Sequence, residues 1–308
     1  MIIKPATGRP NDIIALESIL SRQDLTGQQR RAVETELKKV RSGVKGEADA
    51  SYQIDFHLRD TKNWMVLHDL RLDLGDDVAQ IDHLVINRFL QIFACETKNF
   101  GEGLACNDRG EWVGFYRSRP FGIASPIKQN ERHITVLKRF FKTPHDWHPR
   151  RLGMQIAVDM HSFVLVSNGA RIGRPKKAEV EGMDTVVKIE SFMKSVHEAS
   201  DKLNGLLAMG GLVGAKTLQS FAEGLASAHS PITWDWDARF GLNHIASQGP
   251  VGSAPAAPAQ QDTGEENSSA AGRCEACGVG VDEKVQWFCR RYKSRFGGKI
   301  LCRECQST

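Results

Sequence analysis

The sequence has few of the features that mark a secreted or membrane protein. Its first residues, MIIKPATGRPND, lack the apolar core of a signal peptide. The longest apolar stretch, residues 206–215, is rich in glycine and too short to span a bilayer. Only Cys95 and Cys106 lie outside the last 35 residues, which excludes a disulfide framework spread through the chain. We therefore expect a cytoplasmic protein without a membrane partner.

The charge of the chain is close to balanced, except near its C-terminal end. The 308 residues carry a formal charge of +4, and 41% of them are hydrophobic, which is enough for a core. Residues 273–308 contain eight Lys or Arg residues against four acids and so account for the excess. A local basic segment of this kind suits a polyanion partner, although an ordinary soluble surface explains the charge equally well.

Changes in composition divide the chain into four predicted parts. Residues 1–44 are charged and helical in pattern, and residues 45–247 mix helical and strand patterns around a core at 45–142. Residues 248–272 are rich in Gly, Ala, Pro, Ser and Gln and contain no aromatic residue, which predicts a flexible linker. Residues 273–308 form a small cysteine-rich module.

The patterns within the second part predict an α/β fold with a mixed sheet flanked by helices. Ser125 followed by Pro126 is a typical helix start, with serine as the cap and proline in the first turn. The predicted helices cover residues 46–58, 126–141, 191–209 and 216–226, and the predicted strands cover 64–72, the hairpin at 81–99, 111–117, 163–167 and 185–189.

Two carboxylates and an ammonium stand in the apolar hairpin IDHLVINRFLQIFACETKN at residues 81–99, namely Asp82, Glu96 and Lys98. Side chains two apart share a face of a strand, so Glu96 and Lys98 face the same side. A two-residue turn would send the two carboxylates to opposite sides of the sheet. We expect a three-residue turn at 87–89, which places Asp82 opposite Ala94 and one diagonal step from Glu96.

Two carboxylates at that separation repel one another unless a cation lies between them. Mg²⁺, or Mn²⁺ in its place, suits Asp82 and Glu96, because hard cations take oxygen ligands and commonly use one or two protein carboxylates. Lys98 can then hold an attacking water or neutralise charge at phosphorus, which amounts to metal-assisted phosphodiester hydrolysis. The alternative is structural, with solvated acids at strand ends and a plain Glu96–Lys98 surface pair.

Several motifs in order resemble the nuclease-related domain (NERD) family, a branch of the PD-(D/E)xK restriction-endonuclease-like superfamily, over about residues 45–141. The motifs are KGE at 45–47, VLHDLRL at 66–72, QIDHLVI at 80–86, ETKNFGEG at 96–103 and PIKQNERHITVL at 126–137. One position departs from the superfamily pattern, since Ile81 stands where the proline before the acid would be. That residue is not a ligand, so the departure leaves the site intact.

The resemblance implies a restriction-endonuclease-like fold and a catalytic role for five residues. Asp82 and Glu96 would be the metal ligands and Lys98 the catalytic lysine. Glu47 resembles the helix glutamate that supports the metal or its water, and Gln129 resembles the helix glutamine that positions the site. Two alternatives remain open, because Glu47 could merely complement a helix dipole and Gln129 could be a first-turn polar residue without a role.

The last part of the chain contains two C-x2-C pairs, separated by 24 residues. Cys274, Cys277, Cys302 and Cys305 supply the four thiolates of a structural Zn²⁺ site, and metal binding would supply most of the folding free energy of so small a module. The ending FGGKILCREC resembles a topoisomerase-type zinc ribbon. A fifth cysteine, Cys289, is expected to be a buried thiol, with an exchange of ligands as the alternative.

Aromatic and basic residues alternate between the two cysteine pairs, which suits stacking on bases and contact with phosphates. The alternatives are that the aromatic residues form a small core, or that this surface contacts protein. The residues concerned are Trp287, Phe288, Arg290, Arg291, Tyr292, Lys293, Arg295 and Phe296.

The sequence therefore predicts a Mg²⁺-dependent nuclease that acts on DNA, with a zinc ribbon that aids nucleic-acid binding. DNA processing or repair is the expected setting. The alternative is a catalytically inactive nucleic-acid-binding or adaptor protein with the same fold. The intact set of Asp82, Glu96 and Lys98 favours the enzyme. An RNA-processing enzyme is the third hypothesis, and no RNA-binding motif in the sequence supports it.

Overall fold

The computed structural model of this chain divides into two compact units, Met1–Ser247 and Gln248–Thr308. The predicted linker up to residue 271 and most of the aromatic and basic residues between the cysteine pairs lie outside the described residues. The structure describes residues 1–201, 211–242, 272–277, 279–281, 285–286, 289, 298–302 and 305–306.

A six-stranded mixed sheet with the order β1-β2-β3-β4-β10-β12 forms the centre of the first unit. Strands β2, β3 and β4 are antiparallel neighbours, whereas β1 runs parallel to β2, and β10 runs parallel to both β4 and β12. The strands are β1 (Ile2–Lys4), β2 (Trp64–Asp73), β3 (Val78–Asn87), β4 (Gln91–Lys98), β10 (Asp159–Val166) and β12 (Val186–Lys188).

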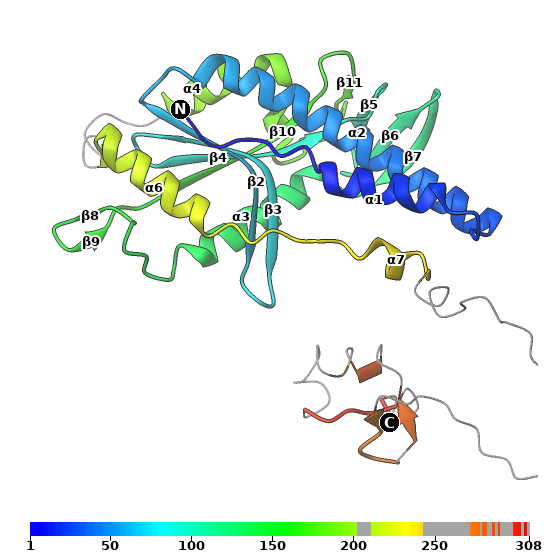
Figure 1. The fold of residues 1–308 in the computed structure, drawn as a ribbon. Coiled ribbons are helices and arrows are strands. Elements are labelled where there is room, and N and C mark those ends of the chain that lie inside the picture. Colours follow the sequence, from blue (N-terminus) through cyan, green and yellow to red (C-terminus); the bar gives the residue numbers. More distant parts are fainter. Residues whose placement is uncertain are drawn as a thin grey trace, which may run out of the picture. The chain divides into compact units, whose positions relative to one another are not determined.

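Helices cover both faces of this sheet (Figure 1). On one face, α2 (Gly27–Leu58) and α4 (Phe192–Ser200) bury residues such as Ile54 and Phe192 against the strands. On the other face, α3 (Pro126–Phe140) and α6 (Ala215–Ser227) bury Leu137, Phe221 and their neighbours. The predicted α/β class with a mixed sheet flanked by helices is confirmed.

Smaller elements surround the central sheet. A four-stranded sheet has the order β11-β5-β6-β7, and helix α1 packs with α7 on the first half of α2. The bounds are α1 (Pro10–Ser21), β5 (Gly103–Cys106), β6 (Trp112–Tyr116), β7 (Arg119–Ile123), β8 (Arg150–Arg151), β9 (Met154–Gln155), β11 (Arg171–Gly173), α7 (Trp236–Arg239), β13 (Gly272–Arg273) and β14 (Gly280–Val281), with 3-10 turns at Met183–Thr185 and Ile189–Ser191.

Helix α2 is longer than its sequence pattern predicts. The expected helix at 46–58 begins at Gly27, where the side chain of Thr26 accepts a hydrogen bond from Gln29 N and the side chain of Gln29 accepts one from Thr26 N. The predicted boundary between residues 44 and 45 therefore falls inside one continuous helix. The first residues of the chain also contain a strand, β1, that their helical charge pattern does not reveal.

The turn between β3 and β4 differs from the predicted three-residue turn at 87–89. The last paired positions are Ile86 and Ile92, so that residues 87–91 connect them. The side chain of Asn87 accepts hydrogen bonds from the backbone N–H groups of Phe89 and Gln91, which stabilises the wider turn. The register therefore shifts by two residues, and a shift of two leaves every side chain of β4 on its predicted face.

Two helix predictions have different outcomes. Helix α3 begins as predicted, because the Ser125 side chain accepts a hydrogen bond from Lys128 N and Pro126 occupies the first turn. The helix expected at 191–209 is observed as α4, which ends at Ser200, and residues 202–210 lie outside the described residues.

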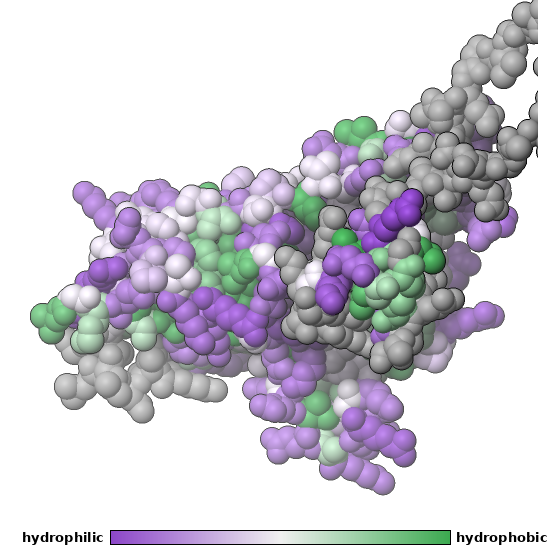
Figure 2. Space-filling model, turned by 90° about the horizontal axis from the view of Figure 1, so that it is seen from below, coloured by the Kyte–Doolittle hydropathy of each residue, from purple (hydrophilic) through white to green (hydrophobic). Residues whose placement is uncertain are grey.

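The surface seen in Figure 2 is mostly hydrophilic, and its hydrophobic residues gather in limited patches. Among the described residues, no helix is both long and apolar enough to cross a membrane.

Candidate active site

Strand β4 carries Glu96 and Lys98 to the end of the central sheet. Ile92 and Ala94, four and two positions before Glu96, face the core that packs against α3, and the alternation continues to Glu96 and Lys98. Lys98 Nζ lies 2.7 Å from Glu96 Oε1 and donates a second hydrogen bond, 3.0 Å long, to Gln129 Oε1. Glu96 is only 4% exposed, so this ion pair is largely withdrawn from water.

Helix α3 supplies the other side of this arrangement. Gln129, in its first turn, donates a hydrogen bond of 2.7 Å from Nε2 to Glu96 Oε1. His133, one turn further along, has its Nδ1 3.6 Å from Glu96 Oε2, and burial lowers the pKa of His133 to about 4, so the ring is neutral at pH 7. Among the described residues, Glu96 Oε2 has no hydrogen-bond partner although it is buried. His133 was not predicted, but its i+4 spacing from Gln129 could have indicated it.

Asp82 lies where the pairing of β3 with both of its neighbours is interrupted. The β3–β4 pairing ends at His83–Cys95, and Asp82 Oδ2 accepts a hydrogen bond of 2.7 Å from the backbone N–H of Thr97. On the other side, Asp69 of β2 stands opposite Asp82 and has a left-handed backbone, with φ 53°. Such a conformation is uncommon for a residue other than glycine and tends to occur at functional sites.

Glu47 approaches from α2, which rests on the end of β4. A side chain at Gly46 would come within 2.5 Å of Asn99 Cβ, so the helix can lie this close only because position 46 is glycine. Burial raises the pKa of Glu47, and the carboxylates of Asp69 and Glu96 raise it further. Asp69 is a second residue that was not predicted, although an acid inside an apolar strand is the same signal that drew attention to Asp82.

We call Glu47, Asp82, Glu96, Lys98 and Gln129 together the charged cluster. Burial raises the pKa of Asp82 well above its ordinary value, and Glu96 and Glu47 raise it further. Burial also raises the pKa of Glu96, against the opposing effect of Lys98. Within the cluster one ammonium faces three carboxylates, while Arg132 acts on Glu96 and Arg9 on Glu47 from outside it. A divalent cation would relieve the remaining repulsion, and Glu96 Oε2, which has no hydrogen-bond partner among the described residues, is an oxygen of the hard type that Mg²⁺ prefers.

A second polar group lies beside the charged cluster, and we call it the histidine network. His83 Nε2 lies 3.1 Å from Thr97 Oγ1, and His83 Nδ1 lies 2.7 Å from His68 Nδ1. His68 Nε2 in turn lies 3.0 Å from Asp55 Oδ1. Both rings are fully buried. The hydrogen-bond partners of the His83 side chain thus lie away from the charged cluster. This is expected because neighbouring residues of a strand, here Asp82 and His83, face opposite sides of the sheet.

The second unit contains a candidate zinc centre. The Sγ atoms of Cys274, Cys277, Cys302 and Cys305 lie within 4.8 Å of one another, and four thiolates around Zn²⁺ would be about 3.8 Å apart. Within the described part of the chain, this is the one group of three or more His, Cys, Asp or Glu side chains gathered so closely. These four cysteines could therefore bind Zn²⁺.

The thiols of this centre strongly perturb one another. Backbone hydrogen bonds at Cys302 and Cys277 lower the pKa of Cys274 to about 6, whereas hydrogen bonds with Cys302 and Cys277 raise that of Cys305 to about 12. A cation bound among the four sulfur atoms would favour the release of the remaining protons. Cys289 is buried outside the group, and its Sγ accepts hydrogen bonds from Leu301 N and Gln306 Nε2.

The comparisons with known proteins give one match. No curated protein and no solved structure matches the chain. Residues 42–167 match the family described as Nuclease-related domain (NERD). This segment includes all five residues of the charged cluster and ends before the cysteine unit. The protein therefore carries a segment that matches a nuclease-related domain, within the mixed α/β fold described above, followed by a cysteine group compatible with a zinc ribbon.

Proposed function

We propose that this protein is a Mg²⁺- or Mn²⁺-dependent nuclease that hydrolyses phosphodiester bonds in DNA. The charged cluster is the observation that carries the proposal, because it gathers three carboxylates and one lysine inside a nuclease-related domain. In a purely structural role, the repulsion among the carboxylates would destabilise the fold with no gain in binding or catalysis.

Asp82 and Glu96 are the residues that would hold the divalent cation. When bound, this cation polarises the phosphate and makes a neighbouring water more acidic. Glu47 lies beside both ligands and would orient the water from the side of α2. Asp82 is already oriented by the N–H of Thr97, and Glu96 by Gln129, so the chain fixes both ligands in advance.

Lys98 would act on the attacking water. Its ammonium group is held by Glu96 Oε1 and Gln129 Oε1, which leaves one of its three protons for a water or a phosphate oxygen. In-line attack by that water forms a new P–O bond and breaks the bond to the leaving oxygen. The water gives up a proton to solvent and the leaving oxygen takes one up, while Lys98 offsets the negative charge that develops at phosphorus.

The cysteine unit would raise the local concentration of substrate. We propose residues 45–247 as the nuclease domain, 1–44 as its helical N-terminal segment, 248–272 as a flexible linker and 273–308 as the zinc ribbon. The excess of Lys and Arg in the ribbon suits contact with phosphates.

A cleavage panel tests the enzyme. Single-stranded, duplex and branched DNA and the corresponding RNA are incubated with the purified protein, with and without Mg²⁺ or Mn²⁺. We expect cleavage of DNA that needs the metal and disappears in Asp82→Ala and Lys98→Ala, while DNA binding persists. Lys194→Ala, which removes an exposed lysine on α4, is the matched control and should cut normally. Binding without cleavage of any substrate would favour the inactive adaptor instead.

A deletion tests the ribbon. Removal of residues 273–308 should weaken DNA binding and reduce the dependence of the affinity on salt, because each lost phosphate contact lowers the slope by about one. An unchanged slope would exclude nucleic acid as the partner of the ribbon.

A further inference from the structure

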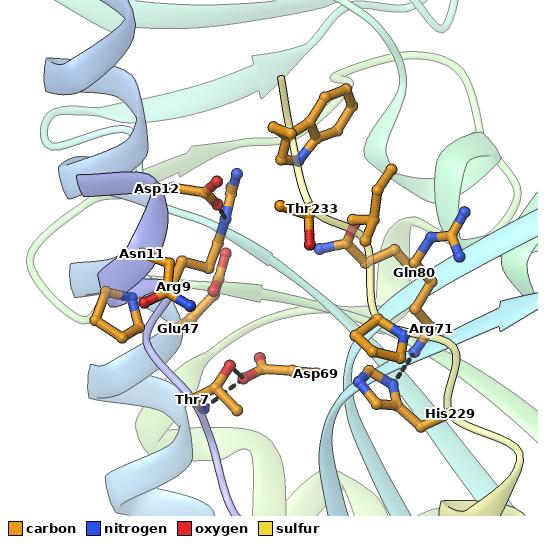
Figure 3. A pocket seen from close by; sticks show the side chains of 14 residues that line it. Thr7, Arg9, Asn11, Asp12, Glu47, Asp69, Arg71, Gln80, His229 and Thr233 are labelled. Atoms are coloured by element: carbon orange, nitrogen blue, oxygen red, sulfur yellow. Dashed lines mark hydrogen bonds and ion pairs between the residues drawn. The ribbon is translucent and has the colours of Figure 1, made fainter. Parts of the chain in front are cut away.

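A pocket of about 320 Å³ lies next to the charged cluster and shares Glu47 with it (Figure 3). Figure 3 shows Glu47 and Arg9 on one side of the pocket, Arg71 and Gln80 on the other, and Asp69 beside Thr7. Its remaining wall is the segment 229–234, which follows α6. Arg9 and this segment lie outside residues 42–167, so the pocket is an addition of this chain to its nuclease-related domain.

Hydrogen bonds fix the wall formed by the segment 229–234. The backbone N–H of Arg71 donates to His229 Nδ1, and Arg71 Nη1 donates to the carbonyl oxygen of Ser230 at 2.9 Å. Beyond the pocket, Trp236 Nε1 donates to Asp12 Oδ1, whose Oδ2 accepts from Arg9 Nε. The wall is therefore tied to β2 and to α1, which preforms the pocket.

The charges of the pocket disfavour a free anion in its interior. Two arginines face three acids there, namely Asp12, Glu47 and Asp69. Asp73 and the carbonyl of Ser230 already occupy the guanidinium of Arg71. An uncharged ring is therefore a better occupant of the interior than a phosphate. The two Nη atoms of Arg9 have no hydrogen-bond partner among the described residues, so Arg9 can meet a phosphate at the edge near Glu47.

Two apolar side chains of the wall remain open to a ligand. Ile232 is 44% exposed and Trp234 is 40% exposed. An exposed indole beside a phosphate-processing site suits stacking on a base. The volume is at the lower end for ligand pockets and cannot admit a double helix, whose major groove alone is about 12 Å wide.

We propose that this pocket takes one unpaired nucleotide of a nucleic-acid strand, with its base on Trp234 and its phosphate on Arg9, at the edge of the pocket that adjoins the charged cluster. The choice of nucleic acid as the ligand rests on the proposed function. It assigns to the protein a preference for single strands or frayed ends over an intact duplex.

Binding measurements test the pocket without requiring cleavage. Full-length Lys98→Ala is titrated, in Mg²⁺, into labelled 12-nucleotide DNA and RNA strands and into the duplexes of the same sequence, and fluorescence anisotropy gives the dissociation constants. We expect one of the single strands to bind at least tenfold more tightly than its duplex. Adding Trp234→Ala should weaken the binding of that single strand about tenfold, as expected for the loss of one base stack, and leave the affinity for the duplex unchanged.

Two further variants separate stacking from folding. Trp234 also contacts Trp236 and Arg239, so its loss could loosen the wall. Trp234→Phe keeps an aromatic face and should restore most of the single-strand affinity. Phe56→Ala, an exposed aromatic on α2 outside the pocket, should change neither affinity.

Equal affinity for single strand and duplex, or an equal loss of both in Trp234→Ala, would overturn the inference. If the protein binds single strands through Trp234 but never cleaves DNA, the inference about the pocket stands and the proposed nuclease function is wrong. If the protein cleaves DNA and Trp234→Ala does not change single-strand affinity, the nuclease proposal stands and the inference about the pocket is wrong.

Discussion

Glu96 and Thr97 are neighbours on β4, yet their side chains belong to polar groups of opposite character. Thr97 joins the histidine network. The distances fit a chain of hydrogen bonds in which Thr97 donates to His83, His83 to His68 and His68 to Asp55, so that each ring nitrogen has a partner. Glu96 joins the charged cluster, in which one of its oxygens has no hydrogen bond among the described residues and like charges crowd together.

We infer from this difference that the histidine network stabilises the fold, whereas the charged cluster serves the proposed function. A fully paired neutral network satisfies buried polar atoms and specifies how the strands pack. A cluster of carboxylates with raised pKa values instead lowers the stability of the fold, and natural proteins keep such groups mainly where binding or catalysis requires them. Substitutions in the two groups should therefore separate activity from stability.

Separate substitutions of Glu96 and Thr97 should give the largest contrast between loss of activity and loss of stability. Glu96→Gln should reduce metal-dependent cleavage by about 10³-fold, because a ligand of the cation is lost, while the protein remains folded. Thr97→Val should leave the rate per folded molecule within a few-fold and destabilise the fold by about 1 kcal/mol, since only a hydroxyl bond to His83 is removed. Single-turnover kinetics and urea unfolding measure the two effects. Similar losses of cleavage rate in both variants would contradict the assignment of Glu96 to a functional group and of Thr97 to a stabilising one.

Metal binding should stabilise the protein through the charged cluster alone. At a Mg²⁺ concentration 100 times its dissociation constant, the free energy of unfolding should rise by about 2.7 kcal/mol. Asp82→Asn should abolish this increase, whereas a control in the second polar group, His83→Phe, should retain it. Thermal unfolding with and without Mg²⁺ measures the change, with Zn²⁺ kept constant so that the cysteine unit does not contribute. An unchanged Mg²⁺ response in Asp82→Asn would place the ion elsewhere.

Acid should weaken the fold through the histidine network. Burial and the neighbouring His68 lower the pKa of His83 well below its usual value, so the folded state does not bind the proton that the unfolded chain takes up near pH 6.5. This contribution is fully present above about pH 6.5, and stability falls below it by about 1.4 kcal/mol per pH unit. His83→Phe should show a shallower loss between pH 6.5 and 5 in urea titrations. Identical slopes would contradict the role of His83.

Much of the fold can be predicted from local patterns. The alternation in β4, the apolar stripe of α3 and the Ser125–Pro126 cap each act within a few residues, and they suffice to bring Glu96, Lys98 and Gln129 into hydrogen-bonding contact. The roles assigned to these residues stay predictions. The turn register could not be predicted, because it depends on which backbone groups the side chain of Asn87 accepts.

Other features depend on contacts between distant parts of the chain. The left-handed backbone of Asp69 arises in a strand whose sequence alone predicts regular pairing, and Thr7, 62 residues away, donates to its carboxylate. Trp234 reaches the pocket because Arg71 holds the segment that precedes it. No short-range pattern contains this information.

The continuity of α2 sets a practical limit on how the protein can be dissected. A recombinant fragment limited to the matched residues 42–167 would retain the charged cluster but would begin in the middle of α2. It would also lack β1, α4 and α6. Apolar surface that Phe192 and Phe221 now cover would face water. Minimal versions of this enzyme candidate should therefore begin before Thr26, so that the helix keeps its own cap.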